Sequence, residues 1–329
     1  MKVIIPVAGM GTRLRPHTHS QPKALLLVAG KTILEYILDE VIKLKPSEII
    51  FITGYLGDKI EQFIKKRYDI NAKFVHQSKQ LGIAHALRQA ETYITEEPLL
   101  IILGDTILTF DYSLIGRLQT SALGVKAVED PRHFGVVELD EKSCIRNLVE
   151  KPENPTTNLA IAGIYYILHP HMLFGAIERL FKEEIKTKGE YQLTDALGLM
   201  IKGGERMCTF EIDGWYDCGK PDALLYTNRV LLERIGGKGT HTEIYPGSIL
   251  RPPVWIDPGA RIERSIVGPH VTVGADAHIT ESIVLESIIS AGATVENIML
   301  HDSLVGEDAI VTGSYQSLNV GDHSEIKLR

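Results

Sequence analysis

The chain has 329 residues, of which 44% are hydrophobic and 23% are charged, a balance that is ordinary for a globular protein. The formal net charge of −7 excludes a general electrostatic attraction to nucleic acid or to an anionic membrane, so any phosphate site must be built from local basic residues. Three scattered cysteines, and no apolar run near the roughly 20 residues that a membrane helix needs, predict a cytoplasmic protein without a disulfide framework.

The first part of the chain alternates strand-like runs with segments of helical period. Val3 to Val7 is rich in β-branched residues, Ile33 to Leu44 has apolar residues at helical spacing, and Ile49 to Thr53 is strand-like again. Val136 to Leu139 and Ala160 to Leu168 are later strand-like stretches. Strands that alternate with helices are typical of βαβ units, so we expect a Rossmann-like α/β fold with a mixed or mainly parallel sheet.

From about residue 240 the helical period disappears, and single aliphatic residues recur every six positions. The recurring residues are Val267, Val273, Ile279 and Leu285, followed by the smaller Ala291. A period of six predicts a left-handed parallel β-helix with aliphatic side chains stacked inside it, and an irregular β-rich tail is the alternative. The glycine-rich stretch 236–239 predicts a hinge, so we expect a catalytic domain over 1–235 and a β-helix domain over 240–329.

The first strand-like run leads directly into a glycine loop, Gly9-Met10-Gly11-Thr12-Arg13. In open α/β sheets, ligands bind at the carboxyl ends of strands, and glycines let the backbone approach phosphate. Leu14 stands where a dinucleotide fingerprint needs its third glycine, and Leu25 stands where a Walker A loop needs its first. Arg13, as a bidentate ligand, and Lys23, as a point charge, could instead neutralise a triphosphate. A tight turn with solvated cations is the alternative.

Two aspartates follow strand-like runs and could hold a metal ion. Asp105 follows the apolar run 99–103, and Asp217 comes after the run 207–212. Magnesium prefers one or two carboxylates together with phosphate oxygens, although each aspartate alone could equally be a turn former or a helix cap. Glu150 and Lys151 form a third charged cluster, which by itself is better explained as a surface ion pair before a turn.

These pieces occur in an order that resembles the sugar nucleotidylyltransferase family. The run GMGTRLRPHTHSQPKALLLVAGKTIL at 9–34 is specific to that family, and LGD at 103–105, VEKP at 149–152 and WYDCGKPDALLYTNRVLL at 215–232 follow in family order. NLAIAGIY at 158–165 looks most like the long-form glucose-1-phosphate thymidylyltransferases, which carry a C-terminal β-helix. The resemblance covers essentially the whole chain.

The resemblance implies a role for each matching position. It implies a catalytic Mg²⁺ held by Asp105 and Asp217, and catalytic contacts of Arg13 with pyrophosphate and of Lys23 with the α-phosphate. The nucleotide-binding residues would be Ala8, Gly9, Gly11, Thr12, Gln77 and Gly82. The residues that bind the sugar phosphate would be Gly135, Glu150, Lys151 and Tyr165. Thr106 and Cys218 depart from the family pattern beside the metal, where Asn and Thr are usual.

The implied reaction joins a nucleoside triphosphate to a sugar 1-phosphate and releases pyrophosphate. We expect dTTP and glucose 1-phosphate, with UTP (for UDP-glucose or UDP-N-acetylglucosamine) and then GTP with mannose 1-phosphate as the alternatives. A non-catalytic sugar-nucleotide-binding protein is a further alternative, against which the retained charged residues argue.

Hexapeptide coils also build acyltransferases, so acetyl transfer is a rival function for the C-terminal part. Its histidines, which would supply the base, are His241, His270, His278, His301 and His323. About 90 residues leave little room for an acyl-coenzyme A groove. We therefore expect the β-helix to be an assembly or regulatory platform that buries surface between the subunits of a homo-oligomer.

Overall fold

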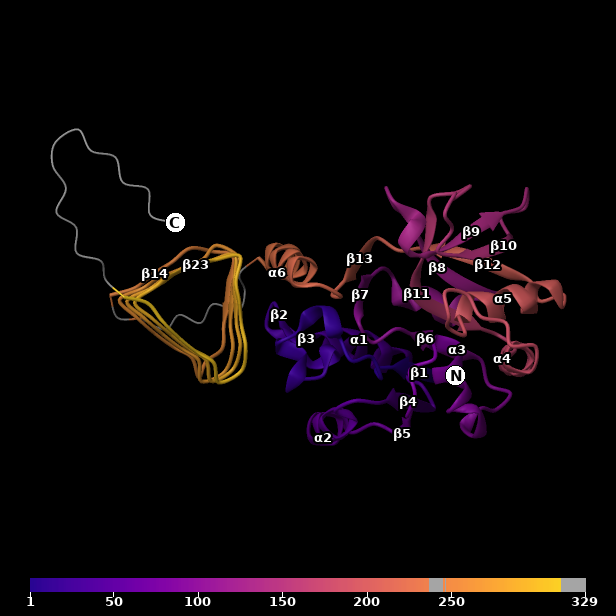
Figure 1. Cartoon of the computed structure of the whole chain (residues 1–329), viewed down its shortest axis with the longest axis horizontal. Coiled ribbons are helices and arrows are strands. Elements are labelled where there is room, and N and C mark those ends of the chain that lie inside the picture. The colour runs from indigo at the N-terminus through magenta and orange to yellow at the C-terminus, as the bar shows by residue number, and fades with distance from the viewer. Residues whose placement is uncertain (237–244, 246, 315–329) are drawn as a thin grey trace. The chain divides into compact units, whose positions relative to one another are not determined.

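The computed structural model describes residues 1–236, 245 and 247–314 (Figure 1). Contacts divide the chain into two compact units, one of Met1–Leu26 with Lys31–Thr227 and one of Leu27–Gly30 with Asn228–Arg329. By contacts, residues 27–30 and 228–235 group with the second unit. The domain boundary that we expect between 235 and 240 stays a prediction. Residues 237–239 of the predicted hinge lie outside the described residues.

The first unit contains a nine-stranded mixed sheet whose main path is β10-β9-β11-β6-β1-β4-β5. Its parallel part consists of β1 (Lys2–Pro6), β4 (Glu48–Thr53), β5 (Ala72–His76) and β6 (Leu99–Ile102). Its remaining strands are β8 (Ser121–Ala127), β9 (Gly135–Leu139), β10 (Ile145–Glu150), β11 (Leu159–Ile167) and β12 (Met207–Glu211). The mixed α/β sheet predicted from the alternating pattern is confirmed, with β11 running antiparallel to β6.

The helices follow the apolar periodicity of the sequence. They are α1 (Ile33–Val41), α2 (Gly57–Arg67), α3 (Ile83–Arg88), α4 (Pro170–Lys182), α5 (Leu193–Lys202) and α6 (Pro221–Ile235). Helix α1 begins with a capping box, in which Thr32 accepts from the Glu35 N–H and Glu35 accepts from the Thr32 N–H. It ends at Val41, and the predicted helical stretch continues to Leu44 only as a 3-10 turn.

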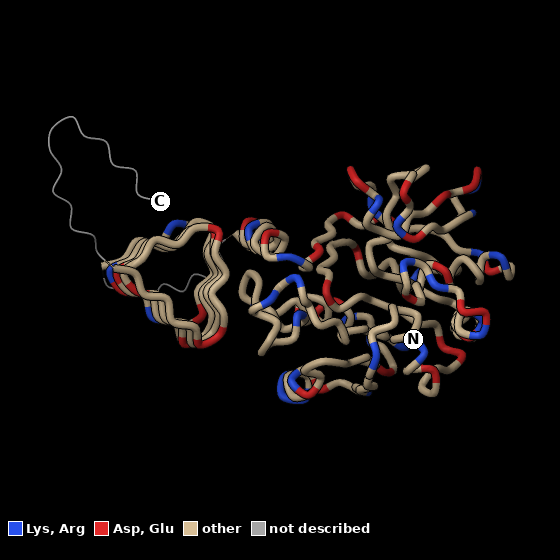
Figure 2. The backbone as a smooth tube through the Cα atoms, viewed as in Figure 1, with Lys and Arg blue, Asp and Glu red and all other residues tan. Residues whose placement is uncertain are grey.

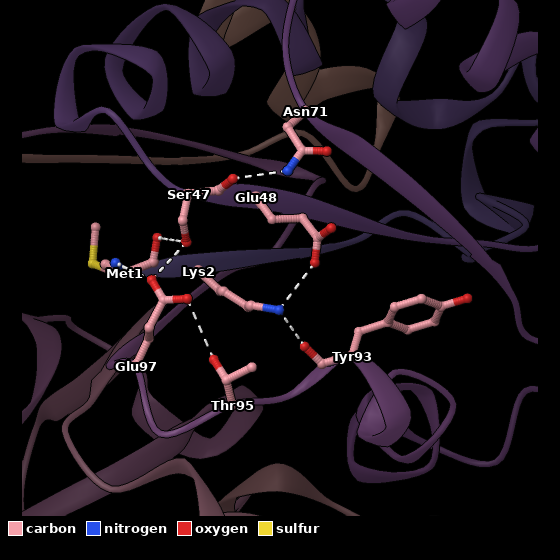
Figure 3. A network of polar contacts seen from close by, with 8 residues as sticks. All are labelled: Met1, Lys2, Ser47, Glu48, Asn71, Tyr93, Thr95 and Glu97. Atoms are coloured by element: carbon pink, nitrogen blue, oxygen red, sulfur yellow. Dashed lines mark hydrogen bonds and ion pairs between the residues drawn. The ribbon is translucent and has the colours of Figure 1, made fainter.

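The start of β1 is fixed by polar contacts at the amino ends of the parallel strands (Figure 3). Lys2 Nζ donates to Glu48 Oε2 at 3.1 Å and to the Tyr93 carbonyl at 2.5 Å. Glu97 accepts from the Met1 ammonium at 2.8 Å and from Ser47 Oγ at 2.6 Å. The ammonium, followed by the Ser47 hydroxyl, lowers the pKa of Glu97 to about 2, because both contacts favour the carboxylate.

The second unit is a parallel β-helix made of three four-stranded sheets, seen end-on as a triangle in Figure 1. The first sheet consists of β14 (Ile249–Leu250), β17 (Ile266–Val267), β20 (Ile283–Leu285) and β23 (Met299–His301). The second consists of β15 (Val254–Ile256), β18 (Val271–Val273), β21 (Ile288–Ile289) and β24 (Leu304–Val305). The third consists of β16 (Arg261–Glu263), β19 (His278–Thr280), β22 (Thr294–Glu296) and β25 (Ile310–Thr312). The left-handed β-helix predicted from the six-residue period is confirmed.

The period of six does not continue along the whole β-helix. Val267, Val273 and Ile279 are fully buried in its interior, as predicted. Leu285 and Ala291 were expected to follow them and do not, because Val284 takes the next interior position. The step from Ile279 to Val284 is five residues instead of six, so Val267 pairs with Val284 rather than with Leu285.

One segment from early in the chain packs within the second unit. The strand β2 (Leu27–Val28) is followed by Ala29, whose N–H donates to Asn228 Oδ1 at 2.9 Å. Asn228 also accepts from Thr272 Oγ1 at 2.6 Å and donates to the His270 carbonyl at 3.0 Å. The buried amide of Asn228 therefore ties residues 27–30 and the second half of α6 to the β-helix.

Charged residues of both signs are scattered along the backbone of both units (Figure 2). Within the described residues, no helix is long and apolar enough to cross a bilayer.

Candidate active site

The glycine loop and the first acidic loop meet at the carboxyl edge of the sheet. Strands β1 and β6 are parallel neighbours, so the segments that follow them leave the sheet side by side. The Gly104 N–H donates to the Pro6 carbonyl at 3.2 Å. A side chain at Gly104 would collide with Val7 Cγ1, so the close approach of the two loops requires glycine there.

A two-stranded ribbon brings the second aspartate to the first. Strand β7 (Thr106–Thr109) pairs antiparallel with β13 (Gly214–Asp217), and this pairing sets Asp217 opposite Thr106. The Cys218 N–H also donates to the Asp105 carbonyl at 3.3 Å. Asp105 and Asp217, which lie 112 positions apart in the sequence, are thereby held next to each other.

Both carboxylates converge on one buried lysine. Lys23 Nζ lies 2.7 Å from Asp105 Oδ2 and 3.9 Å from Asp217 Oδ1. The lysine side chain is 9% exposed, whereas those of the two aspartates are 47% and 45% exposed. The ammonium is therefore buried, whereas the two carboxylates that contact it remain about half exposed to solvent.

The two aspartates fit the ligand set that Mg²⁺ prefers. Magnesium is usually held by one or two carboxylates, with its other ligands supplied by water and substrate phosphates. Among the described residues no group of three or more His, Cys, Asp or Glu side chains could hold a metal, so an ion at Asp105 and Asp217 would need such additional ligands. Burial raises the pKa of Cys218 to about 12, and this neutral thiol adds no ligand.

Two cavities meet at Asp105. The larger has a volume of about 810 Å³ and the smaller about 230 Å³, and both are lined by Ile83, Leu103 and Asp105. Residues predicted from the family motifs divide between them. The larger is lined by Arg13, Asp217, Gly135, Glu150, Lys151 and Tyr165, and the smaller by Ala8, Gly9, Lys23, Gln77 and Gly82. Apart from Arg13, the implied pyrophosphate ligand, which lines the larger cavity, the implied sugar-phosphate residues line the larger cavity and the implied nucleotide residues that line either cavity line the smaller.

Gly11 and Thr12 line neither of these two cavities. Gly11 has φ +59° and accepts a hydrogen bond from Thr18 Oγ1 at 2.8 Å. Thr12 begins the 3-10 turn Thr12–Leu14 that carries Arg13 into the larger cavity. In this geometry both residues shape the loop, and their contact with a nucleotide stays a prediction.

The acid and the lysine of the VEKP motif face the larger cavity. Glu150 ends β10 opposite Gly135, the first residue of β9. Its Oε2 accepts from Thr194 Oγ1 at 2.6 Å, and its Oε1 lies 3.3 Å from Lys151 Nζ. The ion pair that the tripeptide suggests does form, but it lies in the wall of the cavity rather than on an open surface.

Tyr165 lines the same cavity from β11 and is 5% exposed. Burial, followed by the charges of Glu150 and Asp105, raises its pKa above the ordinary value, so the phenol stays neutral. A neutral hydroxyl can donate a hydrogen bond as well as accept one.

The smaller cavity presents amide groups. Gln77 is 6% exposed, and its Nε2 lies 2.8 Å from His85 Nδ1 and 3.5 Å from the Gly82 carbonyl. Gln80 Nε2 donates to the Ala8 carbonyl at 2.7 Å and thereby joins this wall to the glycine loop. Burial, followed by the charges of Arg88 and Lys79, lowers the pKa of His85, so the imidazole is neutral at pH 7.

Thr194, Trp215 and Lys220 are among the residues of the larger cavity that were not predicted as site residues. Thr194 lies in the first turn of α5, a helix for which no prediction was made. Trp215 and Lys220 stand inside the WYDCGKPDALLYTNRVLL motif, on either side of Asp217, and both line the cavity. Because Trp215 and Lys220 stand in that motif, the sequence could have identified them as candidate site residues.

Acetyl transfer, the rival function, would need a β-helix histidine as base, and two of these histidines are paired with carboxylates. His270 is 8% exposed, with Nδ1 2.7 Å from Glu286 and Nε2 3.2 Å from Glu233. His301 Nδ1 lies 2.8 Å from Asp302, and His278 is exposed on β19. His241 and His323 lie outside the described residues.

Comparison with known proteins gives the family. Residues 2–234 match the family model described as nucleotidyl transferase. The chain is 31% identical to a low-salt glycan biosynthesis nucleotidyltransferase of Haloferax volcanii and 29% identical to a glucose-1-phosphate thymidylyltransferase of Streptomyces antibioticus, with 100% of both chains covered in each case. The bifunctional protein GlmU of Methanocaldococcus jannaschii is 37% identical over 76% of this chain and 60% of its own length. A solved UDP-glucose pyrophosphorylase, complexed with UDP-glucose, matches with a TM-score of 0.61 at 26% identity, over 71% of this chain and 98% of that one.

The chain therefore belongs to the nucleotidyl transferase family, and it is an enzyme of the nucleotidyltransferase class. Within that class, the resemblance to the sugar nucleotidylyltransferases carried by the motifs at 9–34, 103–105, 149–152 and 215–232 is confirmed.

Proposed function

We propose that this protein transfers a nucleotidyl group from dTTP to glucose 1-phosphate, forms dTDP-glucose and releases pyrophosphate, with Mg²⁺ as the cofactor. The observation that carries the proposal is the convergence of Asp105 and Asp217 on Lys23, where the two cavities meet. A nucleoside triphosphate with its base in the smaller cavity and its outer phosphates near Arg13 would meet, at these charges, a sugar phosphate in the larger cavity.

The chemistry needs no protein nucleophile. An oxygen of the sugar 1-phosphate forms a bond to the α-phosphorus, and the bond from that phosphorus to the bridging oxygen of pyrophosphate breaks. Mg²⁺ bound by Asp105 and Asp217 supplies charge screening for the phosphates. Lys23 would stabilise charge on the α-phosphate, Arg13 would bind the departing pyrophosphate, and Lys151 would bind the sugar phosphate.

The amide of Gln77 supports a base with an imide N–H. Neutral His85, with its proton on Nε2, can accept from Gln77 Nε2 through Nδ1, and the Gly82 carbonyl can accept from the same amide. The Gln77 oxygen is then left to accept from the base. Thymine and uracil offer an N3–H, and guanine offers an N1–H, whereas cytosine and adenine offer no ring N–H there. Overall resemblance favours thymine among the three.

A second candidate is transfer from UTP to N-acetylglucosamine 1-phosphate or glucose 1-phosphate. It is favoured by the 37% identity to the GlmU protein over 76% of this chain, beside the 29% identity to the thymidylyltransferase over the whole chain. GTP with mannose 1-phosphate is the third combination that the Gln77 amide allows.

The deciding experiment is a panel of pyrophosphate-release assays with Mg²⁺. It combines dTTP, UTP, GTP, CTP and ATP with glucose, N-acetylglucosamine and mannose 1-phosphates. We expect dTTP with glucose 1-phosphate to give the highest kcat/KM and CTP and ATP the lowest. A preference for UTP with N-acetylglucosamine 1-phosphate would replace the first candidate with the second, and no release from any pair would refute the enzymatic proposal.

We also propose that the β-helix mediates a homo-oligomer. Ile249, Ile266, Ile283 and Met299 stand in register across the first sheet, and Ile249 and Met299 are 56% and 66% exposed. A column of outward-facing aliphatic residues on a flat sheet is suited to burial against another copy. Light scattering of the full-length protein should therefore give a multiple of the 36.5 kDa chain mass, and a monomer at micromolar concentration would refute this part.

A further inference from the structure

Lys220 occupies a position that helix energetics disfavours for a lysine. Helix α6 begins at Pro221, and the Lys220 carbonyl accepts the first helical hydrogen bond, from the Leu224 N–H at 2.9 Å. Lys220 is therefore the N-cap residue, where Ser, Thr, Asp or Asn can accept from a free backbone N–H and lysine cannot. Its charge also lies at the positive end of the helix dipole. The start of α6 gains no stability from a lysine here.

The lysine instead contributes a charge to the larger cavity. Lys220 lines this cavity together with Arg13 and Asp217. Arg13 Nη2 lies 3.1 Å from the point where a Cβ on Gly219 would be, so the guanidinium adjoins the residue directly before Lys220. Asp217 Oδ1 lies 2.9 Å from the same point, and Lys220 is the next residue along the chain that lines this cavity.

These two cations differ from the other two in the site. Lys23 is paired with Asp105, and Lys151 is paired with Glu150. Within the part of the chain that the structure describes, neither Arg13 nor Lys220 has a carboxylate at ion-pair distance, and both are exposed. Asp217, the carboxylate that lies nearby, is the one assigned to the metal, so both cations remain available to an anion in this cavity.

We propose that Lys220 binds, together with Arg13, the β- and γ-phosphates of the nucleoside triphosphate, which depart as pyrophosphate. This inference rests on the proposed function. Pyrophosphate is the most highly charged product of that reaction, and two neighbouring cations can divide its charge between them. The sugar phosphate already has Lys151 as its cation, so Lys220 is assigned to the other anion.

The test is Lys220→Ser, which separates a binding role from a structural one. Serine is a preferred N-cap residue, so the melting temperature should be equal to or above that of the wild type. The variant lacks the cation, so pyrophosphate binding measured by calorimetry with Mg²⁺ should weaken by about 10-fold, the effect of losing one hydrogen bond to a charged group. Lys220→Arg, which keeps the charge, should stay within about 3-fold of the wild type.

Lys59→Ser is the matched control, because Lys59 is an exposed lysine of α2 in the same unit and lines neither cavity. It should bind pyrophosphate as the wild type does. In turnover assays, Lys220→Ser should raise the KM for the nucleoside triphosphate and leave the KM for the sugar 1-phosphate unchanged.

Wild-type affinity for pyrophosphate in Lys220→Ser would overturn the inference, and so would a wild-type protein that does not bind pyrophosphate. A raised KM for the sugar 1-phosphate with unchanged pyrophosphate affinity would assign Lys220 to the other substrate and overturn it as well. A wild-type protein that binds pyrophosphate but turns over no substrate pair would refute the proposed function, while the calorimetric comparison would still decide the role of Lys220.

Discussion

Replacing Asp105 by asparagine should remove most of the activity and leave the fold intact. The change keeps the shape of the side chain but removes one of the two carboxylates beside Lys23, whose Nζ lies 2.7 Å from Asp105 Oδ2. The loss of one charge clamp on a phosphoryl-transfer transition state costs about 3–4 kcal/mol. We therefore expect kcat to fall by about 10²–10³-fold.

The effect on stability should be far smaller. Asp105 is 47% exposed, so solvent screens its ion pair with Lys23, and such a pair contributes about 1 kcal/mol or less. Asp217, at 3.9 Å, remains as a second partner for the ammonium. A loss of about 1 kcal/mol lowers the melting temperature by about 2–4 °C in a protein of this size, so unfolding cannot explain a hundredfold loss of turnover.

The assay is pyrophosphate release at saturating substrates, with the melting temperature measured on the same preparations. Asp111→Asn is the control, because Asp111 is an exposed aspartate that pairs with Arg117 and lines neither cavity. We expect it to retain wild-type turnover. If Asp105→Asn kept turnover within a factor of a few, the assignment of Asp105 to the metal would be wrong.

Three further changes test other parts of the account. Thr194→Val removes the 2.6 Å hydrogen bond to Glu150, so the KM for the sugar 1-phosphate should rise by about 10-fold while the KM for the nucleotide stays unchanged. An equal rise in the two KM values would contradict a role of Thr194 confined to the sugar-phosphate site. The pKa of His85 is lowered, so its imidazole should be protonated only at a pH below the ordinary value of 6.5, and the imidazolium can no longer accept a hydrogen bond from Gln77. The preference for dTTP over CTP should therefore narrow at low pH in the wild type. In His85→Ala it should be lost at all pH values. Met299→Glu places a charge in the exposed aliphatic column, so the assembly measured by light scattering should become smaller. Turnover per chain at saturating substrates should stay unchanged. An unchanged mass of the assembly would place the interface elsewhere.

Local patterns in the sequence were sufficient to predict the strand-end part of the site. A β-branched run followed by glycines places the loop at residues 9–13 on the carboxyl edge of the sheet, and an apolar run followed by Asp105 places the acid there too. Both predictions need only that the two strands run parallel. The loops that follow them then leave the same edge of the sheet.

The parts that sequence patterns did not reveal depend on contacts between distant segments. Asp217 follows the strand Met207–Glu211 as expected, but it stands in a further strand, β13, whose pairing with β7 brings it to Asp105. Thr194 acts on Glu150 from a helix that carries no recognised motif. The five-residue step from Ile279 to Val284 follows from strand pairing around the coil, which a fixed period of six cannot represent.

The central claim is that this chain forms a sugar nucleotide, and ³¹P NMR of the wild-type protein with Mg²⁺, dTTP and glucose 1-phosphate tests it most directly. We predict that the sugar monoester resonance disappears while a diphosphate diester and pyrophosphate appear in equal amounts, and that excess chelator stops the reaction. Persistence of the monoester while inorganic phosphate accumulates, or an unchanged spectrum with every nucleotide and sugar phosphate of the panel, would contradict the account.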